Sequence, residues 1–257
     1  MSANKVAARL LSAGIENARL EAEWLCRQLS GEALEAAISR RCEGYPLQYL
    51  LGEWDFYRQT YEVSEDCLIP RADTETLVEK AISLLPEGAR FLDLCTGSGC
   101  IAVSTLCERS DTSGVAVDLF EPTLALAGRN AARNGVADRL TLLCANVLNA
   151  PPTEVGVAPF DAILSNPPYI RRDAMAGLQR EVQYEPKAAL FGGEDGLDFY
   201  RAILKEWQTV LKKDGFFLFE IGYDQGDALR ALGAEYGFFP TVYQDYGGND
   251  RVVLLKR

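Results

Sequence analysis

Residues 90–118 have the sequence RFLDLCTGSGCIAVSTLCERSDTSGVAVD, which predicts a strand, a tight turn, a helix and a second strand. The first strand is expected over 90–94 and the second over 114–117, where short apolar runs occur. Between them, Gly97 and Gly99 permit a tight turn at the start of the helix. A strand followed by a helix and another strand is the repeating unit of a parallel sheet.

The same alternation continues to the end of the chain. Further strands are expected over 140–144, 160–164, 216–221, 239–243 and 251–255, and helices over 74–85, 100–108, 121–134, 197–211 and 225–236. This order predicts an α/β fold with a doubly wound, mostly parallel sheet of seven strands. The last two strands are expected to form an antiparallel pair at the edge of the sheet. Asp73 is a candidate cap for the helix that begins at Thr74.

The first 44 residues predict a small helical unit. Apolar stripes within 6–11, 20–29 and 33–38 indicate three helices. Such a unit is too small to hold a core alone, so we expect it to pack on another part of the protein. Residues 45–66 are expected to form a hairpin linker around Gly52, and 67–257 the domain that contains the sheet.

The amino-acid composition limits the classes of function that the protein can have. The net charge is −11, with 26 basic and 37 acidic residues, which weighs against direct nucleic-acid binding without excluding it. The chain has no histidine, which excludes Ser-His and Cys-His nucleophile pairs and imidazole ligands. Its seven cysteines show no paired CxxC spacing, so we expect no disulfides, no metal site and a cytoplasmic location. Neither a membrane span nor a signal peptide is expected.

The glycine turn and the strand after it form a candidate nucleotide site. In open α/β sheets, ligands bind beyond the carboxyl ends of the strands. Asp118 ends the second strand about 20 residues after the glycines, where an acidic residue accepts hydrogen bonds from ribose hydroxyls. A solvated loop carboxylate or a helix cap is the alternative for Asp118. The full G-x-G-x-x-G fingerprint is absent, so the turn alone is also consistent with a plain connection.

Two more positions complete this site. Asn146, after the third strand, could contact an adenine edge while Val147 packs on the face of the base. Asp93, at the tip of the first strand, could face the cationic part of a sulfonium cofactor or bond the amides of the turn itself. Together these positions predict an adenosine-shaped cleft. The candidate cofactor-binding residues are Asp93, Cys95, Thr96, Gly97, Ser98, Gly99, Asp118, Asn146 and Val147, together with Asn166.

The tetrapeptide Asn166-Pro167-Pro168-Tyr169 follows the strand at 160–164 and predicts the catalytic centre. The prolines lack an N–H and have a fixed φ, so the segment cannot continue a strand ladder. It can instead hold the Asn166 amide and backbone carbonyls in a rigid array of acceptors. Such an array suits a substrate with an –NH2 group, which predicts methyl transfer to an amide or amine nitrogen. Pro168 is expected to shape the turn, and the ring of Tyr169 to wall the pocket.

Two other groups of side chains are expected to have mainly structural roles. Charged residues in the first group are expected to form surface ion pairs, although they could also support the substrate loop: Arg71, Glu75 and Glu185. Aromatic residues in the second group are expected to pack in the core: Phe191, Tyr200 and Trp207. The loop over 170–183 is long and charged, and we expect it to become ordered only with substrate.

Taken together, these residues resemble the class I S-adenosylmethionine-dependent methyltransferases, which have a Rossmann-like fold, and the N-P-P-Y motif resembles that of enzymes that methylate planar –NH2 nitrogens. The stretch Leu68-Ile69-Pro70-Arg71-Ala72-Asp73-Thr74-Glu75 is similar to a segment of the release-factor glutamine methyltransferases (the HemK/PrmC type). Further similar stretches are Glu185-Pro186, Ala189-Leu190, Asp195-Gly196-Leu197, Tyr200-Arg201, Glu220-Ile221-Gly222, Asp245-Tyr246-Gly247 and Arg251-Val252-Val253.

This resemblance implies S-adenosyl-L-methionine as the cofactor and class 1 peptide-chain release factors as partners. The reaction that it implies is N5-methylation of the glutamine in the Gly-Gly-Gln motif, and it implies that residues 1–44 help to dock the substrate. The chain departs from the family pattern at three positions: Ala72 replaces a proline, Cys95 a glycine and Asn146 a common aspartate. The N-terminal part is also shorter, by roughly a helical pair.

Three alternatives remain open. A glutamine methyltransferase that acts on a large-subunit ribosomal protein would share the active site and differ in docking. A nucleic-acid amino-N methyltransferase would also use such a tetrapeptide, and it should show a basic face or a separate recognition domain. A non-catalytic module that binds S-adenosylmethionine would not require Asn166.

Overall fold

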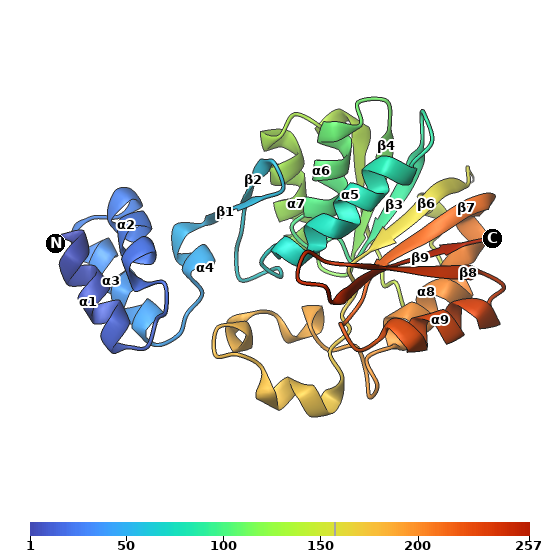
Figure 1. The fold of residues 1–257 in the computed structure, drawn as a ribbon. Helices are drawn as coiled ribbons and strands as arrows, with labels where there is room; N and C mark the ends of the chain where they lie inside the picture. Colours follow the sequence, from blue (N-terminus) through green and yellow to red (C-terminus); the bar gives the residue numbers. More distant parts are fainter. Residues whose placement is uncertain (157) are drawn as a thin grey trace.

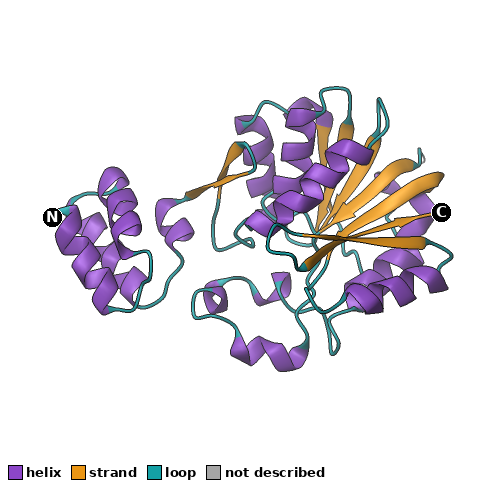
Figure 2. Ribbon diagram, viewed as in Figure 1, coloured by secondary structure: helices purple, strands orange, loops and turns teal. Residues whose placement is uncertain are grey.

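A seven-stranded sheet forms the centre of the larger part of the molecule (Figures 1 and 2). The computed structural model describes residues 1–156 and 158–257. The strands of the sheet are β3 (Arg90–Leu94), β4 (Ser113–Asp118), β5 (Leu140–Cys144), β6 (Phe160–Ser165), β7 (Leu211–Glu220), β8 (Phe239–Gln244) and β9 (Asp250–Lys256). Their order is β5-β4-β3-β6-β7-β9-β8, and β9 runs antiparallel to both of its neighbours. The predicted α/β fold, with its antiparallel pair at the edge, is confirmed.

Helices cover both faces of the sheet (Figure 1). One layer contains α5 (Glu75–Leu84), α6 (Cys100–Glu108) and α7 (Glu121–Arg133), and the other contains α8 (Asp198–Glu206) and α9 (Gly226–Glu235). Side chains alternate along each strand, which divides the core into two halves. In β7, Phe216 and Leu218 pack toward the first layer, whereas Phe217 and Phe219 pack toward the second.

The strand β7 is longer than predicted. It begins at Leu211, which pairs with Phe160, and the helix α8 before it ends at Glu206. Residues 212–214 are exposed and polar, so this part of the strand has no apolar alternation that the sequence could reveal. The expected helix over 197–211 was therefore too long at its carboxyl end.

The N-terminal helices form a unit with its own hydrophobic core, apart from the sheet (Figure 1). Its helices are α1 (Ala3–Ser12), α2 (Ala18–Gln28) and α3 (Gly31–Cys42). Val6, Leu10, Leu25 and Ile38 are fully buried within it. The three predicted helices are thus confirmed, whereas the expectation that so small a unit cannot hold a core alone is wrong.

The linker that follows contains one unexpected helix. This helix is α4 (Leu47–Leu51), and it ends at Gly52, whose φ of 74° is left-handed. The predicted hairpin is present as β1 (Glu53–Phe56) and β2 (Gln59–Glu62). Its turn lies at residues 57–58 and not around Gly52, because that glycine terminates the helix.

Short 3-10 turns connect several elements. They are η1 (Ala72–Thr74), η2 (Ala137–Arg139), η3 (Thr153–Val155), η4 (Arg172–Gly177), η5 (Val182–Tyr184), η6 (Lys187–Ala189) and η7 (Trp207–Val210). The prediction that Asp73 caps the following helix is wrong. The α5 helix has no side-chain cap, and the Asp73 carboxylate instead lies 3.3 Å from the guanidinium of Arg251.

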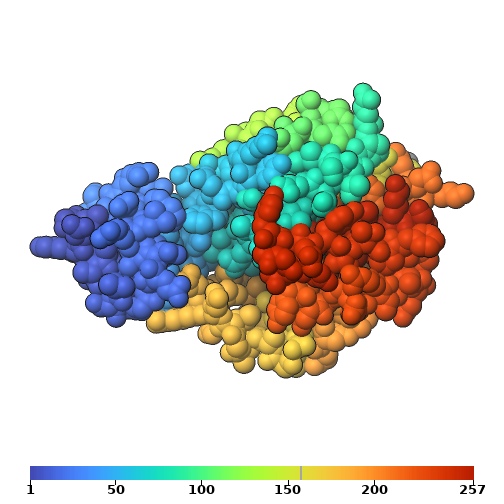
Figure 3. Space-filling view, viewed as in Figure 1, coloured from blue at the N-terminus to red at the C-terminus, as the bar shows by residue number. Residues whose placement is uncertain are grey.

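The segment after β6 leaves the sheet and returns to it. Its two ends are joined because Ile170 donates its N–H to the Leu190 carbonyl at 2.8 Å and accepts one from Gly192 at 2.9 Å. Between these ends the segment reaches the N-terminal helices, where Arg41 donates to Glu181 at 2.8 Å. Figure 3 shows this gold segment against the blue N-terminal unit. That the loop becomes ordered only with substrate stays a prediction.

Within residues 1–156 and 158–257, no helix combines the length and the apolar character needed to cross a membrane.

Candidate active site

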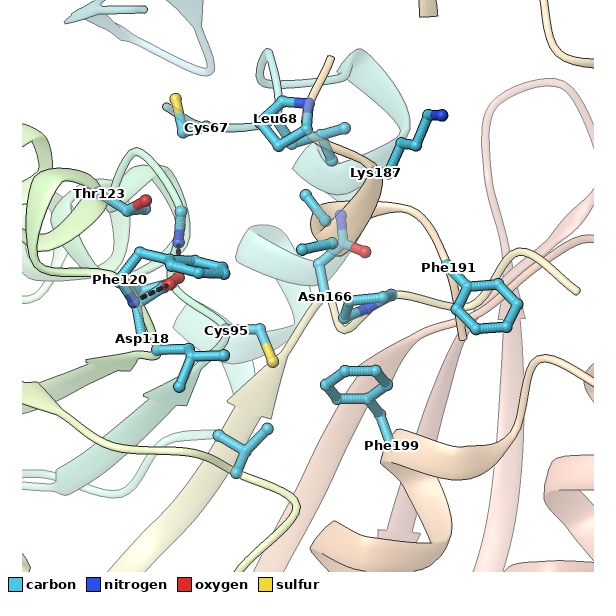
Figure 4. A pocket seen from close by; sticks show the side chains of 18 of the residues that line it. Cys67, Leu68, Cys95, Asp118, Phe120, Thr123, Asn166, Lys187, Phe191 and Phe199 are labelled. Carbon is cyan, nitrogen blue, oxygen red and sulfur yellow. Dashed lines mark hydrogen bonds between the residues drawn. The ribbon is translucent and has the colours of Figure 1, made fainter. Parts of the chain in front are cut away.

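A cavity of about 750 Å³ opens at the carboxyl ends of the parallel strands (Figure 4). Its volume is in the range of small-molecule sites in proteins. It lies where the strand order reverses, between β3 and β6, which is the usual ligand position in a doubly wound sheet. Because Leu94 of β3 pairs with Ser165 of β6, the glycine turn and the N-P-P-Y tetrapeptide leave the sheet side by side. The two motifs predicted to form the site therefore share one cavity.

Three of the five residues in the glycine turn, 95–99, have a left-handed backbone conformation. Cys95, Gly97 and Gly99 have φ angles of 59°, 57° and 81°. At Gly99 an added Cβ would come within 3.2 Å of the Ala127 side chain, so glycine here lets α6 pack closely against α7. Cys95 also has a left-handed backbone conformation, which residues other than glycine rarely adopt.

Residues 95–98 of this turn line the cavity, whereas Gly99 lies behind it. The sulfur of Cys95 points into the cavity (Figure 4). Burial raises the pKa of this thiol well above its usual range, so the thiol stays protonated.

Asp118 lies at the cavity as predicted and also supports the turn. Its Oδ2 accepts the backbone N–H of Gly97 at 3.0 Å, and its Oδ1 accepts that of Phe120 at 3.3 Å (Figure 4). Burial raises the pKa of this carboxyl. Each carboxylate oxygen has a second lone pair, so Asp118 can still accept hydrogen bonds from a ligand.

The Asp93 carboxylate bonds a hydroxyl of the turn and a backbone N–H of α6, and it bonds none of the turn's amides within the described residues. The side chain is fully buried, and its Oδ2 accepts the Thr96 hydroxyl at 2.6 Å and the Ala102 N–H at 3.2 Å. It shares the alternating face of β3 with Phe91, directed toward the α6 layer, and it does not line the cavity. Burial raises its pKa to about 7. These contacts favour support of the turn over direct contact with a cofactor.

The residues after the end of β5 supply a polar group and apolar walls to the cavity. The Oδ1 of Asn146 accepts the Leu148 N–H at 2.9 Å, so the Nδ2 group of Asn146 is left as a donor at the cavity. Val147 is buried, and its carbonyl accepts the indole N–H of Trp207 at 3.0 Å. The sequence did not predict Phe120, whose ring lies beside the cavity (Figure 4). An aromatic residue two positions after Asp118 was the available signal.

Asn166 projects into the cavity from the end of β6 (Figure 4). Its Nδ2 donates to the Thr74 hydroxyl at 3.2 Å. Within the described chain, its Oδ1 accepts no hydrogen bond, so this oxygen is the end of the amide that is available to a ligand. Pro168 also lines the cavity, whereas Pro167 is buried outside the lining.

Two predictions about aromatic residues are wrong. The Tyr169 ring does not wall the cavity: it packs with the α8 side of the core, and its hydroxyl donates to Glu220 at 3.3 Å. The Gln225 side chain donates to the backbone carbonyl of Tyr169 at 3.2 Å, which fixes the backbone at this position. Phe191, expected in the core, lines the cavity together with Phe199 (Figure 4). Phe191 lies at the end of the segment that leaves the sheet after β6, which we call the excursion (residues 170–192), and Phe199 lies just beyond it in α8. The sequence did not indicate the path by which this segment returns to the sheet.

Tyr200 and Trp207 are fully buried, as predicted. The predicted surface ion pairing is wrong for Glu185, which is 3% exposed. This carboxylate pairs with Arg71 and accepts the Ile69 N–H at 3.0 Å, so it holds the segment that forms one wall of the cavity. Glu75 accepts the backbone N–H of Tyr57 at 2.8 Å and fixes the hairpin turn.

Comparisons with known proteins agree with this geometry. Residues 73–186 match the family model described as a methyltransferase small domain. The solved structure of a methyltransferase from Pyrococcus furiosus has a TM-score of 0.57 and 20% identity, covering 76% of this chain and 87% of that one, which shows the shared fold. The family model and the shared fold point to the class of methyltransferases.

More similar relatives specify the family. The release factor glutamine methyltransferase of Geobacter sulfurreducens is 39% identical, and the match covers 95% of this chain and 91% of the relative. The enzyme with the same name from Agrobacterium fabrum is 37% identical over 100% of this chain and 97% of its own. The chain therefore belongs to the release factor glutamine methyltransferase family, and the resemblance seen in its motifs is confirmed.

Proposed function

We propose that this protein transfers the methyl group of S-adenosyl-L-methionine to the N5 side-chain amide of the glutamine in the Gly-Gly-Gln motif of class 1 peptide-chain release factors, and so modulates translation termination. One observation carries the proposal. The Asn166 amide is anchored through Nδ2 to Thr74 and leaves its oxygen toward the cavity. An acceptor in this position suits a substrate that donates through –NH2.

The residues around the cavity fit an adenosyl cofactor. Asp118 retains acceptor capacity for ribose hydroxyls, and the free Nδ2 of Asn146 suits a ring nitrogen of adenine. Phe120 and Val147 offer apolar surface for the faces of the base. When bound, S-adenosylmethionine supplies a methyl group on a cationic sulfur.

The tetrapeptide would act by positioning. A carboxamide nitrogen is a poor nucleophile because its lone pair is delocalised into the carbonyl. The Asn166 oxygen would accept one N–H of the substrate amide and so direct the nitrogen lone pair at the methyl carbon. A bound S-adenosylmethionine would supply the methyl group to this nitrogen and keep the C–S electron pair on its sulfur, while the nitrogen would lose one proton to water. Aligned placement can supply roughly 7–11 kcal/mol, so no base of pKa near 7 is required.

The N-terminal unit, residues 1–44, is proposed to dock the release factor. It has its own core, and it contacts the excursion after β6 through Arg41 and Glu181. That excursion lines the cavity with Lys187 and Phe191, so a partner held by the N-terminal unit would lie near the reacting atoms. The net charge of −11 supports a protein partner over nucleic acid. Seven free cysteines support a cytoplasmic location.

The test is methyl transfer from radiolabelled S-adenosylmethionine to a purified release factor, with large-subunit ribosomal proteins and DNA in parallel. We expect label on the Gly-Gly-Gln glutamine with the wild type and none with Asn166→Ala. Asn149→Ala is the matched control, since Asn149 is exposed near the cavity without lining it. Label on a ribosomal protein or on DNA instead would overturn the proposed partner. No label anywhere, despite cofactor binding, would favour a non-catalytic module.

A further inference from the structure

The side chain of Gln225 joins three loops at the carboxyl ends of the strands. Its Nε2 donates to the backbone carbonyls of Tyr169 and Gly196, both at 3.2 Å, and its Oε1 accepts the N–H of Gly222 at 2.9 Å. The residue is 8% exposed and does not line the cavity. Both N–H groups of this carboxamide are therefore used, and all three of its partners are backbone atoms.

These partners fix the orientation of the Gln225 amide. A backbone N–H can only donate and a carbonyl can only accept, so the oxygen must face Gly222 and the nitrogen must face the two carbonyls. The backbone of Gln225 is held as well. Its N–H donates to the Gly222 carbonyl at 2.9 Å, and its carbonyl accepts the N–H of Leu229 in α9 at 3.0 Å. The amide is therefore a fixed support for the loops that it joins.

The N-P-P-Y tetrapeptide needs support from outside its own strand. The strand β6 ends at Ser165, and the two prolines that follow have no N–H with which to extend its ladder. Beyond the prolines, Gln225 holds the carbonyl of Tyr169. Asn166 therefore lies between two anchors, the strand on one side and the Gln225 amide on the other.

The loop that shares this support packs directly on the tetrapeptide. A Cβ added to Gly196, whose φ is 78°, would lie 2.3 Å from the Tyr169 carbonyl oxygen and 2.8 Å from Nε2 of Gln225. A Cβ added to Gly192 would lie 2.6 Å from the Pro168 carbonyl oxygen. Glycine at these two positions lets the loop approach the tetrapeptide so closely that one amide reaches both.

We propose that Gln225 is a positioning residue of the methyl-transfer step. Its amide fixes the backbone of the tetrapeptide, and so fixes the place from which Asn166 presents its oxygen to the substrate –NH2. Gln225 does not line the cavity, so it acts through Asn166 and not on the reacting atoms. This inference rests on the proposed function, because the step that it concerns is methyl transfer to an –NH2 group.

Asn130 of α7 offers a matched comparison at the other motif of the cavity. Its Nδ2 donates to the carbonyls of Glu62 and Ser98 at 3.0 and 2.9 Å, and its Oδ1 accepts the Glu62 N–H at 2.7 Å. The side chain is fully buried. As at Gln225, one carboxamide binds two carbonyls and one N–H, but the loop that it supports is the glycine turn, to which Ser98 belongs. Variants of the two amides should therefore affect different steps.

The test compares Gln225→Met with Asn130→Leu. Calorimetry gives the affinity for S-adenosylhomocysteine, and single-turnover methyl transfer to a release factor is measured at saturating cofactor. We expect Gln225→Met to lower the rate roughly 100-fold, since a misplacement of about 1 Å can cost that much, and to change the dissociation constant less than about twofold. In Asn130→Leu the dissociation constant should instead rise about tenfold, with a saturated rate within about twofold of the wild type.

The division between rate and affinity separates positioning from a merely structural role. A wild-type rate in Gln225→Met would overturn the inference. So would a Gln225→Met protein that loses rate and cofactor affinity by equal factors, because the damage would then extend to the whole cavity.

A second pair of variants serves if Gln225→Met does not fold. Gly196→Ala places a methyl group against the same contact, so it should lower the rate with unchanged cofactor affinity. Gly237→Ala is its control, because Gly237 has a matching φ of 79° and open space where a Cβ would lie. It should keep the wild-type rate. Equal rates in these two alanine variants would contradict the proposal.

Amide hydrogen exchange gives a readout that needs no substrate. The N–H groups of Ile170 and Gly192 bond across the loop beside the tetrapeptide. Their exchange should become at least about tenfold faster in Gln225→Met and stay unchanged in Asn130→Leu. Unchanged exchange in Gln225→Met would overturn the inference. If the wild type does not methylate the release factor but exchange responds as expected, the proposed substrate fails and the support of the tetrapeptide stands.

Discussion

The Nδ2 atom of Asn166 lies 3.2 Å from the Oγ1 atom of Thr74, and this contact joins two stretches of chain that are 92 positions apart. Thr74 belongs to the stretch 68–75, which resembles a family segment, and Asn166 begins the N-P-P-Y tetrapeptide. One hydrogen bond therefore joins the two motifs at the cavity, and it anchors the Asn166 amide at its Nδ2 end. Their joint occurrence in the sequence has a physical reason in this contact.

Replacing Asp118 should weaken cofactor binding through two effects. Asp118→Ala removes an acceptor at the cavity and also releases the Gly97 N–H that Oδ2 holds at 3.0 Å. We expect the dissociation constant of S-adenosylhomocysteine, measured by calorimetry, to rise at least tenfold, which is about 1.4 kcal/mol. Asp118→Asn keeps one acceptor oxygen and should have a smaller effect, and exposed Asp138→Ala should have none. Equal affinity in Asp118→Ala and the wild type would contradict this assignment.

Trp207 should stabilise the cavity wall through its indole N–H. This group donates to the Val147 carbonyl at 3.0 Å and to the Asn149 carbonyl at 3.1 Å, and the side chain is fully buried. Trp207→Phe leaves these carbonyls without their donor, so the free energy of unfolding should fall by about 1–3 kcal/mol. Urea denaturation measures the change, and cofactor affinity should fall as well. Trp54→Phe in the hairpin serves as the control, and an equal loss there would argue against a specific role for Trp207.

Stability should decrease as the pH rises because of Asp93. Burial raises its folded-state pKa to about 7, from 3.8 for an ordinary aspartate. Between these two values the folded protein binds more protons than the unfolded chain, so each added pH unit costs about 1.4 kcal/mol. Glu220 acts in the same direction. Urea midpoints at pH 5 and 8 should therefore differ less in Asp93→Asn than in the wild type, and parallel values in the two proteins would refute the assignment.

Two carboxylates that bind the same arginine should differ in their effect on stability. Arg41 donates to Glu21 at 2.6 Å and to Glu181 at 2.8 Å, and the exposed fractions of these side chains are 3%, 9% and 43%. Glu21→Gln removes a charge from a fully desolvated pair and should cost about 3–5 kcal/mol. Glu181→Gln removes a half-exposed partner and should cost less than about 1 kcal/mol. Thermal unfolding of both variants tests this prediction. An equal loss of stability in the two variants would mean that burial does not determine how much each ion pair contributes.

The sequence alone determined the elements of the fold and the two motifs at the site. These features could be predicted because each signal affects only the few residues around it. The signals are the apolar runs of the strands, the glycines at 97 and 99, and the prolines at 167 and 168. Apolar runs and helical patterns therefore located the seven strands and predicted an α/β sheet with an antiparallel pair at its edge, whereas the order of the strands came from the structure. The same short-range sequence patterns predicted that Asp118 and Asn166 lie at strand ends, where the cavity is found.

Only the tertiary structure decided which way the functional side chains point. A strand pattern shows that Asp93 alternates with its neighbours, but the packing of α6 decided that its carboxylate supports the turn. The Tyr169 ring packs on the α8 side of the core, where its hydroxyl donates to Glu220, and Glu185 is buried where it bonds Ile69 and Arg71. These contacts join residues far apart in the chain, and their strength depends on burial that exists only after the elements have packed. Local periodicity carries no information about such contacts, which is why the motifs could be predicted and their mutual support could not.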